Sequence, residues 1–369
     1  MNIGIAGAGI IGRLLAWQLL EHGHKVTLFD QLPMDSAASC SFTAAGMLTP
    51  FSEGETAEPL VVALGQQSLK RWPELVSQLG TDVSFKSGGT LVVAHTQDRG
   101  DYQRFTAAVS SRMDLSEQQY RLLQQHHLAE LEPELAGRFS QAAYLPDECW
   151  LCTHSTMKQL ANKLQQLGVV WHDSTDVSAV NSGEIEVCDA SGKHAYSFDM
   201  AVDCRGLGAK DALPVRGVRG ELVWLDAPDV QIDRLVRLMH PRYRIYVVPR
   251  KDNLYLIGAT QIESEDFSDI SVRSTLELLS AAYSLHPGFA EARVVNTAVN
   301  CRPALSDNQP RIEFSDGLIR VNGLFRHGYL MAPTLSDEVL AIIANPGHQS
   351  RFEGLVHQPV NVACEIACG

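Results

Sequence analysis

Gly7-Ala8-Gly9-Ile10-Ile11-Gly12 is the stretch that decides the fold. It stands between a short apolar run at 3–8 and residues 10–21, whose large apolar side chains recur at helical spacing. A second apolar run ends at Asp30, 18 residues after the last glycine of the stretch. A glycine-rich turn in this βαβ setting, with an acid closing the second strand, is typical of dinucleotide-binding sites. The alternative, a turn that binds nothing, is disfavoured by the spacing and by the acid.

Each glycine of this stretch has a physical role in such a site. Gly7 allows the tight turn, Gly9 lets the backbone approach a pyrophosphate at the helix N-terminus, and Gly12 permits close packing of helix and sheet. Asp30 can accept hydrogen bonds from the adenosine ribose, and an acid there disfavours a 2′-phosphate and therefore NADP. The predicted dinucleotide contacts of this turn are Gly7, Gly9, Ile10, Ile11, Gly12 and Asp30.

Composition and charge exclude several classes of protein. Of the 369 residues, 45% are hydrophobic and 20% charged, a balance typical of globular proteins. The 30 Lys and Arg against 43 Asp and Glu give a net charge of −13, which disfavours nucleic acid as a partner. No apolar run reaches the roughly 18 to 20 residues that cross a bilayer, and the N-terminus lacks the basic region of a signal peptide. We therefore expect a cytoplasmic protein whose eight cysteines are reduced.

The periodicity along the chain predicts two interleaved domains. Short β-rich runs in 216–300 surround one helical pattern at 274–285, which indicates an antiparallel sheet. A polar helical pattern covers 116–136, and the chain later continues with a strand at Leu318–Asn322 and a helix from about Leu335 to Ala344. The fold class is therefore α/β, with a Rossmann-type dinucleotide-binding domain and an antiparallel-sheet substrate domain of α+β type. The predicted boundaries are 1–80, 153–215 and 301–345 for the first domain, 81–152 and 216–300 for the second, and 346–369 for a C-terminal tail.

Three further segments carry a resemblance to a known family. Ser36–Leu48 (SAASCSFTAAGML) is rich in small residues and lacks strand or helix periodicity, Val202–Ala209 (VDCRGLGA) ends a strand in a glycine turn, and Gly323–Pro333 (GLFRHGYLMAP) contains a late glycine-bounded turn. Together with the first glycine-rich stretch, they resemble the D-amino acid oxidase superfamily of flavoproteins, and within it the glycine oxidase and sarcosine oxidase branch. The resemblance covers nearly the whole chain to about residue 345.

The resemblance implies that the dinucleotide is FAD, held in an extended form and roofed by the substrate domain. In the sarcosine oxidase branch a cysteine tethers the flavin covalently. Cys301 lies near that place, but alignment on Asp307 puts Asn300 there, so noncovalent FAD is expected. The backbone N–H groups of a late turn in this family stabilise negative charge on the reduced flavin. The residues that match the family's flavin contacts are Thr43, Ala44, Ala45, Gly46, Met47, Gly206, Gly328, Tyr329, Leu330 and Met331.

The resemblance also implies a site for an amino acid carboxylate. Arg302 occupies the place of the family's carboxylate-binding arginine, and a guanidinium can hold a carboxylate through two hydrogen bonds. Tyr246 matches the tyrosine that assists it, Arg326 matches a second active-site arginine, and His327 is a candidate through its place beside the flavin. The alternatives are a surface arginine before a turn and a strand tyrosine packed in the core. Gln261 departs from the apolar residue that the family often has near the substrate.

The implied activity is oxidation of a small amino acid or N-substituted glycine to an imine and then a 2-oxo acid, with O2 reduced to H2O2. Two alternatives stay open. One is a flavin dehydrogenase or maturation flavoprotein with a quinone or protein partner, and the other is a dinucleotide-binding sensor without activity. No metal site is expected, because Cys149 and Cys152 have no partner pair at zinc spacing, and Cys364 and Cys368 are four apart in the tail. Their sequence surroundings also disfavour a working dithiol at Cys149 and Cys152.

Overall fold

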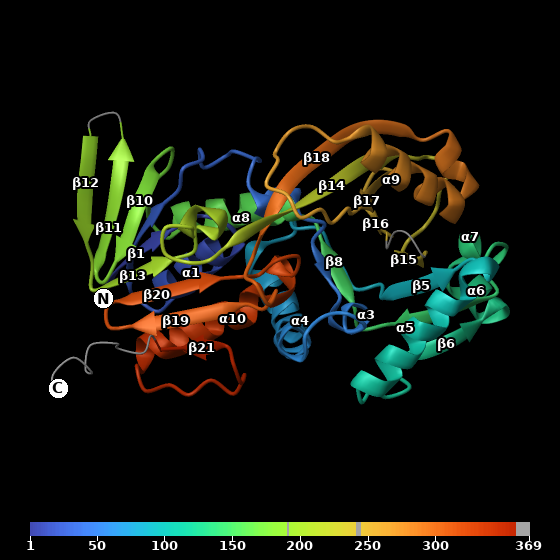
Figure 1. Ribbon diagram of the computed structural model, residues 1–369, viewed down its shortest axis with the longest axis horizontal. Helices are drawn as coiled ribbons and strands as arrows, with labels where there is room; N and C mark the ends of the chain where they lie inside the picture. The colour runs from blue at the N-terminus through green and yellow to red at the C-terminus, as the bar shows by residue number, and fades with distance from the viewer. Residues whose placement is uncertain (190–191, 241–244, 359–369) are drawn as a thin grey trace, which may run out of the picture.

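The computed structural model describes residues 1–189, 192–240 and 245–358. Two β-sheets stand next to each other with helices around them, the first in the left half of Figure 1 and the second in the right half. Two long paired strands, β14 (Arg216–Asp226) and β18 (Arg293–Ala304), reach from the second sheet towards the first. The site described below lies where the two sheets meet.

The first sheet has the Rossmann-type arrangement. Its strand order is β21-β19-β20-β13-β1-β2-β9, with β20, β13, β1, β2 and β9 parallel and β19 antiparallel to β20. The strands are β1 (Asn2–Ala6), β2 (Lys25–Phe29), β9 (Val170–His172), β13 (Met200–Asp203), β19 (Arg311–Ser315), β20 (Leu318–Asn322) and β21 (Val356–His357). The carboxyl ends of the parallel strands meet at one edge, which is where sheets of this kind bind ligands.

Helices bury the apolar side chains of this sheet. The helices that contact one another around it are α1 (Ile10–Glu21), α4 (Pro59–Leu79), α8 (Thr153–Gln166) and α10 (Gly328–Ala344). Apolar side chains recur along α1, and they enter the main core of the protein, where Trp17 and Trp72 are fully buried. Other members of this core are Ile3, Ile5, Leu14, Val26, Leu28, Met157, Leu160, Val202, Ile319, Met331 and Leu335.

Helix α10 begins at Gly328, earlier than the predicted start near Leu335. Residues 329–336 are all buried, so this part of the helix has no polar face and the amphipathic period is missing. Pro333 lies inside the helix and cannot donate a hydrogen bond to the carbonyl of Tyr329. The indole N–H of Trp72 donates to that carbonyl at 2.9 Å instead. Packing against α4 therefore supports the first turns of this helix, which the sequence pattern did not show.

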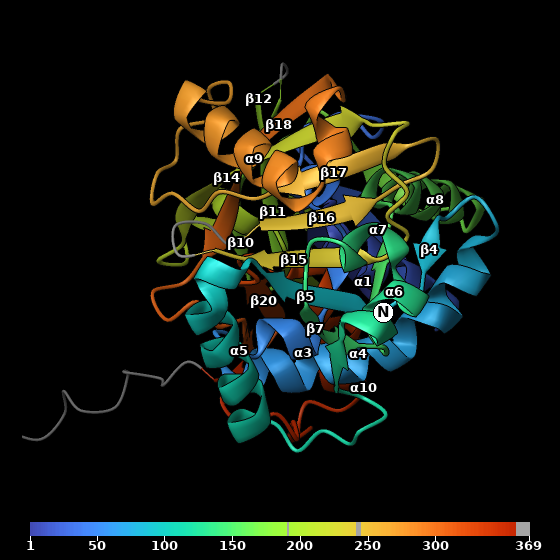
Figure 2. The ribbon, with the colours of Figure 1, turned by 90° about the vertical axis from the view of Figure 1, so that its right-hand side faces the viewer.

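The second sheet has the strand order β18-β14-β17-β16-β15-β5-β7-β6. Its other strands are β5 (Thr90–Ala94), β6 (Arg121–Gln124), β7 (Gln141–Leu145), β15 (Leu235–Met239), β16 (Ile245–Pro249) and β17 (Leu254–Gly258). Most neighbours are antiparallel, as predicted, and β15 and β5 are parallel. Helix α9 (Val272–Leu285) covers one face, as Figure 2 shows, and that face forms a second core. The opposite face is left to line the site.

Smaller elements complete the fold. The helical pattern at 116–136 was wrong in part, because β6 precedes the short helices α6 (Gln125–Leu131) and α7 (Pro133–Ala136). Pairing of β6 with β7 overrides the local pattern. The remaining elements are α2 (Cys40–Thr43), β3 (Met47–Leu48), α3 (Pro50–Glu53), β4 (Phe85–Lys86), η1 (Thr96–Asp98), α5 (Arg99–Arg112), β8 (Cys149–Leu151), β10 (Asp176–Asn181), β11 (Glu184–Asp189), β12 (Gly192–Ser197), η2 (Gly206–Ala209) and η3 (Pro287–Ala290).

The fold class predicted from the sequence is confirmed, since a Rossmann-type sheet and a mainly antiparallel sheet alternate along the chain. The predicted tail contributes β21, which pairs with β19, and Leu355 beside it is fully buried. The boundary at residue 345, like the other domain boundaries, stays a prediction. Among the described residues, no helix is both long enough and apolar enough to cross a membrane.

Candidate active site

A cavity of about 410 Å³ lies between the two sheets. One wall is made by residues at the carboxyl ends of β1, β2, β13 and β20, and the other by the face of the second sheet that α9 does not cover. The predicted site residues that line it are Gly7, Gly9, Ile10, Ile11, Asp30, Thr43, Ala44, Ala45, Gly46, Met47, Gly206, Tyr246, Arg302, Arg326, His327, Gly328, Tyr329 and Leu330. Segments that are far apart in the chain thus form one cavity, whose lining does not include Gly12 or Met331.

The glycine-rich turn lies between β1 and α1 at the edge of the first sheet. Gly7 has φ +98°, and a Cβ there would come within 2.5 Å of the carbonyl oxygen of Cys204. A Cβ at Gly12 would lie 1.9 Å from the carbonyl oxygen of Gly7, so Gly12 serves packing rather than contact with a ligand. Asp30 accepts hydrogen bonds from the backbone N–H of Ala8 at 2.6 Å and of Leu32 at 2.8 Å. These bonds fix its carboxylate at the mouth of the turn.

The small-residue segment forms the middle of the cavity. Gly46 has φ +67°, and a Cβ there would lie 2.2 Å from the carbonyl oxygen of Leu151. The side-chain amide of Asn300, on β18, donates to the hydroxyl of Thr43 at 3.1 Å. The guanidinium of Arg250 donates to the carbonyl of Ala45 at 2.6 Å. The second sheet therefore holds this segment at Thr43 and Ala45.

The start of α10 closes the cavity on the side of the first sheet. The first backbone N–H groups of a helix have no partner within it and carry partial positive charge. Gly328, Tyr329 and Leu330 supply such groups next to the cavity. Met331 differs from the prediction, because its N–H donates to the carbonyl of His327 at 3.0 Å and its side chain is fully buried in the core. Its amide is already used within the helix.

Arg302, on β18, presents its guanidinium to the cavity. Its Nη1 donates to the carbonyl oxygens of Thr260 at 3.1 Å and of Arg219 at 3.4 Å. The guanidinium lies over Gly220, where a Cβ would come within 2.3 Å of Nη2. Burial lowers the pKa of Arg302. No carboxylate among the described residues forms an ion pair with it, so its charge is left for a ligand.

Arg326, just before α10, has a different environment. It forms an ion pair with Glu53, at the end of α3, and its Nη1 lies 3.5 Å from the side-chain oxygen of Gln261. Burial alone would raise the pKa of Glu53, but the charges of Arg326 and Arg237 lower it to about 2. Glu53 is therefore ionised at neutral pH and offsets the charge of Arg326.

Two further predicted residues, Tyr246 and His327, line the same cavity. Tyr246 lies on β16, opposite Gly258 of β17, and burial raises the pKa of its hydroxyl although the charges of Arg302 and Arg326 oppose this. His327 is buried at the N-cap of α10, and burial lowers its pKa to about 4. Its ring is therefore uncharged at neutral pH.

Comparisons with known proteins agree with this geometry. The model of a family described as FAD dependent oxidoreductase matches residues 2–341. The chain belongs to this family. The ThiO protein of Rhizobium etli, whose name proposes a role as a thiamine biosynthesis oxidoreductase, is 38% identical over 92% of this chain and 95% of its own length. The glycine oxidase of Geobacillus kaustophilus is 28% identical over 90% of each chain. The crystal structure of that organism's glycine oxidase superposes with a TM-score of 0.81, at 26% identity and with 95% of each chain covered.

The residues of this FAD-dependent oxidoreductase fit the cofactor. Gly7 and Gly9 line the cavity beside the N-terminus of α1, where a Cβ at either position would crowd Cys204 or Ser41, and Asp30 lines it where a ribose would lie. The amides of Gly328 to Leu330 would provide donors for the pyrimidine edge of the flavin. The thiol of Cys301 lies 3.7 Å from the carbonyl oxygens of Ser264 and Asp266, whereas the side chain of Asn300 reaches the small-residue segment. This arrangement supports noncovalent binding.

Sequence reasoning missed several residues of the site. Glu53 and Gly220 line the cavity, and Thr260 supplies a carbonyl to Arg302. A signal existed in Arg219-Gly220-Glu221, where opposite charges two residues apart flank a glycine within an apolar strand. Nothing local to Glu53 shows that it would meet Arg326, which is 273 residues away in the chain.

Cys149 and Cys152 do not form a disulfide in the structure. Cys149 and Cys152 are both free thiols. Cys149 is buried with its thiol 3.4 Å from the carbonyl oxygen of Asp147, and burial raises its pKa to about 12, which disfavours a reactive thiolate. Cys364 and Cys368 lie outside the described residues.

Proposed function

We propose that this oxidoreductase oxidises a small amino acid or N-substituted glycine to the imine, which water hydrolyses to the 2-oxo acid. The electrons pass to O2, which is reduced to H2O2. The guanidinium of Arg302 is the observation that carries the proposal, because it lies in the cavity with no carboxylate of the described chain paired to it. A half-buried cation without a counter-ion favours an anionic ligand. The likeness to ThiO and to glycine oxidases supports glycine as the first substrate to test.

The lining residues would divide the work as follows. Arg302 binds the carboxylate through two hydrogen bonds, and the hydroxyl of Tyr246 donates a third. Bound FAD would accept a hydride from the substrate Cα. Alignment of that carbon depends on the walls of the cavity. Asn300 holds the small-residue segment through Thr43, and the amides at the start of α10 would hold the flavin. Binding and orientation are thus the contributions of the chain.

The amine must be neutral before its neighbouring carbon is oxidised. His327 is uncharged at neutral pH, because burial lowers its pKa to about 4. It therefore adds no positive charge beside the substrate nitrogen, and a neutral amine is not opposed there. Arg326 also adds little net charge, because it is paired with Glu53. This charge distribution favours a substrate with one carboxylate, held at Arg302.

The test uses the purified yellow holoenzyme without oxygen. Glycine, sarcosine and the D- and L-amino acids are added in turn, and loss of the visible flavin absorbance is recorded. We expect bleaching by at least one small amino acid and stoichiometric H2O2 when air is admitted. Protein without flavin, or flavin that no amino acid bleaches, would contradict the proposal. Slow reoxidation by air with fast reoxidation by a quinone would instead favour a dehydrogenase.

A further inference from the structure

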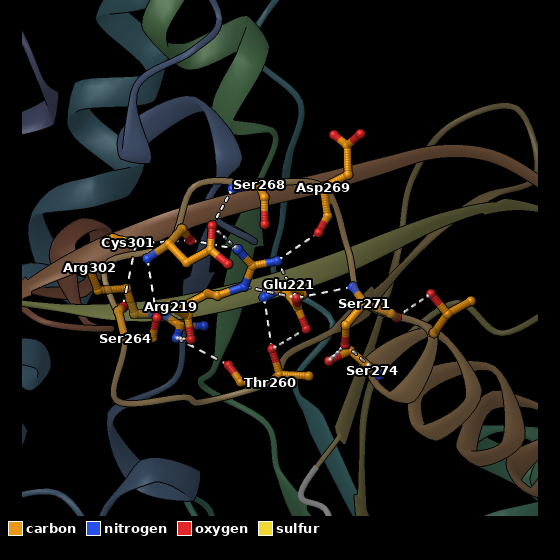
Figure 3. A network of polar contacts seen from close by, with 12 residues as sticks. Arg219, Glu221, Thr260, Ser264, Ser268, Asp269, Ser271, Ser274, Cys301 and Arg302 are labelled. Carbon is orange, nitrogen blue, oxygen red and sulfur yellow. Dashed lines mark hydrogen bonds and ion pairs between the residues drawn. The ribbon is translucent and has the colours of Figure 1, made fainter.

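A buried ion pair lies behind the arginine that faces the cavity. Arg219 and Glu221 are two residues apart on β14, and their side chains are 5% and 0% exposed. Nε and Nη2 of Arg219 donate to Oε1 of Glu221 at 2.9 and 2.6 Å. Because side chains alternate along a strand, this pair shares the α9 face of the sheet with Val223, while Gly220 faces the cavity. Figure 3 shows the pair at the centre of a polar network.

The ion pair holds the loop of residues 259–270, which connects β17 with α9. Nη1 of Arg219 donates to the carbonyl of Asp266 at 2.5 Å, and Nη2 donates to the carbonyl of Asp269 at 2.8 Å. Oε1 of Glu221 accepts from the backbone N–H of Ser271 at 3.3 Å. Burial alone would raise the pKa of Glu221, but hydrogen bonds from Ser274 and Arg219 lower it. The second half of the loop, up to the start of α9, is therefore fixed to one strand.

Thr260 links this network to the cavity. Its hydroxyl donates to Oε2 of Glu221 at 3.2 Å and accepts from the backbone N–H of the same residue at 3.0 Å. Its carbonyl accepts from Nη1 of Arg302 at 3.1 Å. The second carbonyl that holds Arg302 is that of Arg219 itself. Both backbone acceptors of the guanidinium are thus fixed by the buried pair, as Figure 3 shows.

We propose that Arg219, Glu221 and Thr260 are positioning residues that set the guanidinium of Arg302 for a substrate carboxylate. The inference rests on the proposed function, since it assumes that Arg302 binds that carboxylate. A buried ion pair contributes little net stability against an apolar replacement, so its place behind the site calls for another explanation. Orientation of a ligand-binding group within a fraction of an ångström is such an explanation.

The test compares Thr260→Val with Thr260→Ser in the holoenzyme. Valine keeps the shape and removes the hydroxyl that joins Glu221 to the loop, whereas serine keeps the hydroxyl. Glycolate, a carboxylate without an amine to oxidise, is titrated against the flavin spectrum. We expect Thr260→Val to raise its dissociation constant about tenfold and Thr260→Ser to change it less than about threefold. The KM for glycine should rise in parallel while kcat stays within about twofold.

Thr106→Val is the matched control, because its hydroxyl donates to the carbonyl of Gln103 on α5, away from the cavity lining. We expect it to bind glycolate as the wild type does. Glu221→Gln should weaken glycolate binding at least as much as Thr260→Val does. The double variant should bind glycolate little more weakly than either single variant. Unchanged glycolate binding in Thr260→Val would overturn the positioning role. Arg302→Ala in the same titration separates the two ideas, since unchanged binding there would contradict the proposed function itself.

Discussion

Arg302 and Arg326 line the same cavity but belong to different parts of the molecule. Arg302 extends from a strand of the second sheet and meets only carbonyl oxygens among its described hydrogen-bond partners. Arg326 precedes the helix that packs on the first sheet, and Glu53 offsets its charge. The role of each arginine thus depends on whether the fold supplies a carboxylate as its counter-ion. An arginine left without one is prepared for an external anion, and an arginine that has one is a fixed part of the wall.

The largest effect is expected from Arg302→Ala. The substrate loses a charge-assisted bidentate contact worth on the order of 2 to 4 kcal/mol, so the KM for glycine should rise tens- to hundreds-fold. Flavin content should not change, because the predicted cofactor contacts are other residues of the cavity. Arg302→Lys should recover part of the loss, since an ammonium cannot reproduce the planar fork. Steady-state kinetics with the bound flavin quantified by absorbance checks both points. Release of FAD by the alanine variant would assign Arg302 to the cofactor or the fold.

Arg326→Ala should act on stability more than on binding. It leaves the carboxylate of Glu53, whose side chain is 10% exposed, without its partner in this ion pair. We expect a loss of about 2 kcal/mol in the free energy of unfolding, less than for a fully buried pair because the Arg326 side chain is 29% exposed. Chemical denaturation of the holoenzyme measures this loss. The double variant Arg326→Ala with Glu53→Gln should regain most of it. An equally stable single variant would show that the ion pair is not made in solution.

The same ion pair predicts a dependence of stability on pH. The pKa of Glu53 falls from its ordinary 4.5 to about 2 in the folded protein. Its contribution is therefore present above about pH 4.5 and is lost as the pH falls towards 2. Between pH 7 and 3 we expect the wild type to lose about 1 to 2 kcal/mol more than Glu53→Gln. If the free energy of unfolding falls equally in the two proteins over this pH range, the pKa of Glu53 is not lowered in the folded protein.

Gly220→Ala tests the surface on which the guanidinium of Arg302 lies. The added Cβ would come within 2.3 Å of Nη2, and the flexible end of the arginine must then move. We expect the KM for glycine to rise about tenfold with the fold intact. Gly137→Ala is the matched control, since a Cβ there meets nothing within 4 Å and its φ is −74°. Equal kinetics for the two variants would mean that Arg302 does not use this surface.

Prediction from the sequence succeeded where the signal is local. The glycine-rich turn, the acid that closes β2 and the period of α1 all lie within 30 residues, and they determine the first sheet's binding edge. The start of α10 was missed because its first two turns are buried on all sides. The partner of Arg326 was missed for another reason. Glu53 reaches it only after sheets from distant parts of the chain have assembled, and no short-range pattern records such a contact.

The most direct measurement is a crystal structure of the holoenzyme with glycolate bound. The contrast between the two arginines predicts that both carboxylate oxygens lie about 2.7 to 2.9 Å from the guanidinium of Arg302. The hydroxyl of Tyr246 should donate to one of them, while Glu53 stays paired with Arg326. A carboxylate bound to Arg326 with Glu53 displaced, or glycolate placed away from both arginines, would contradict this assignment.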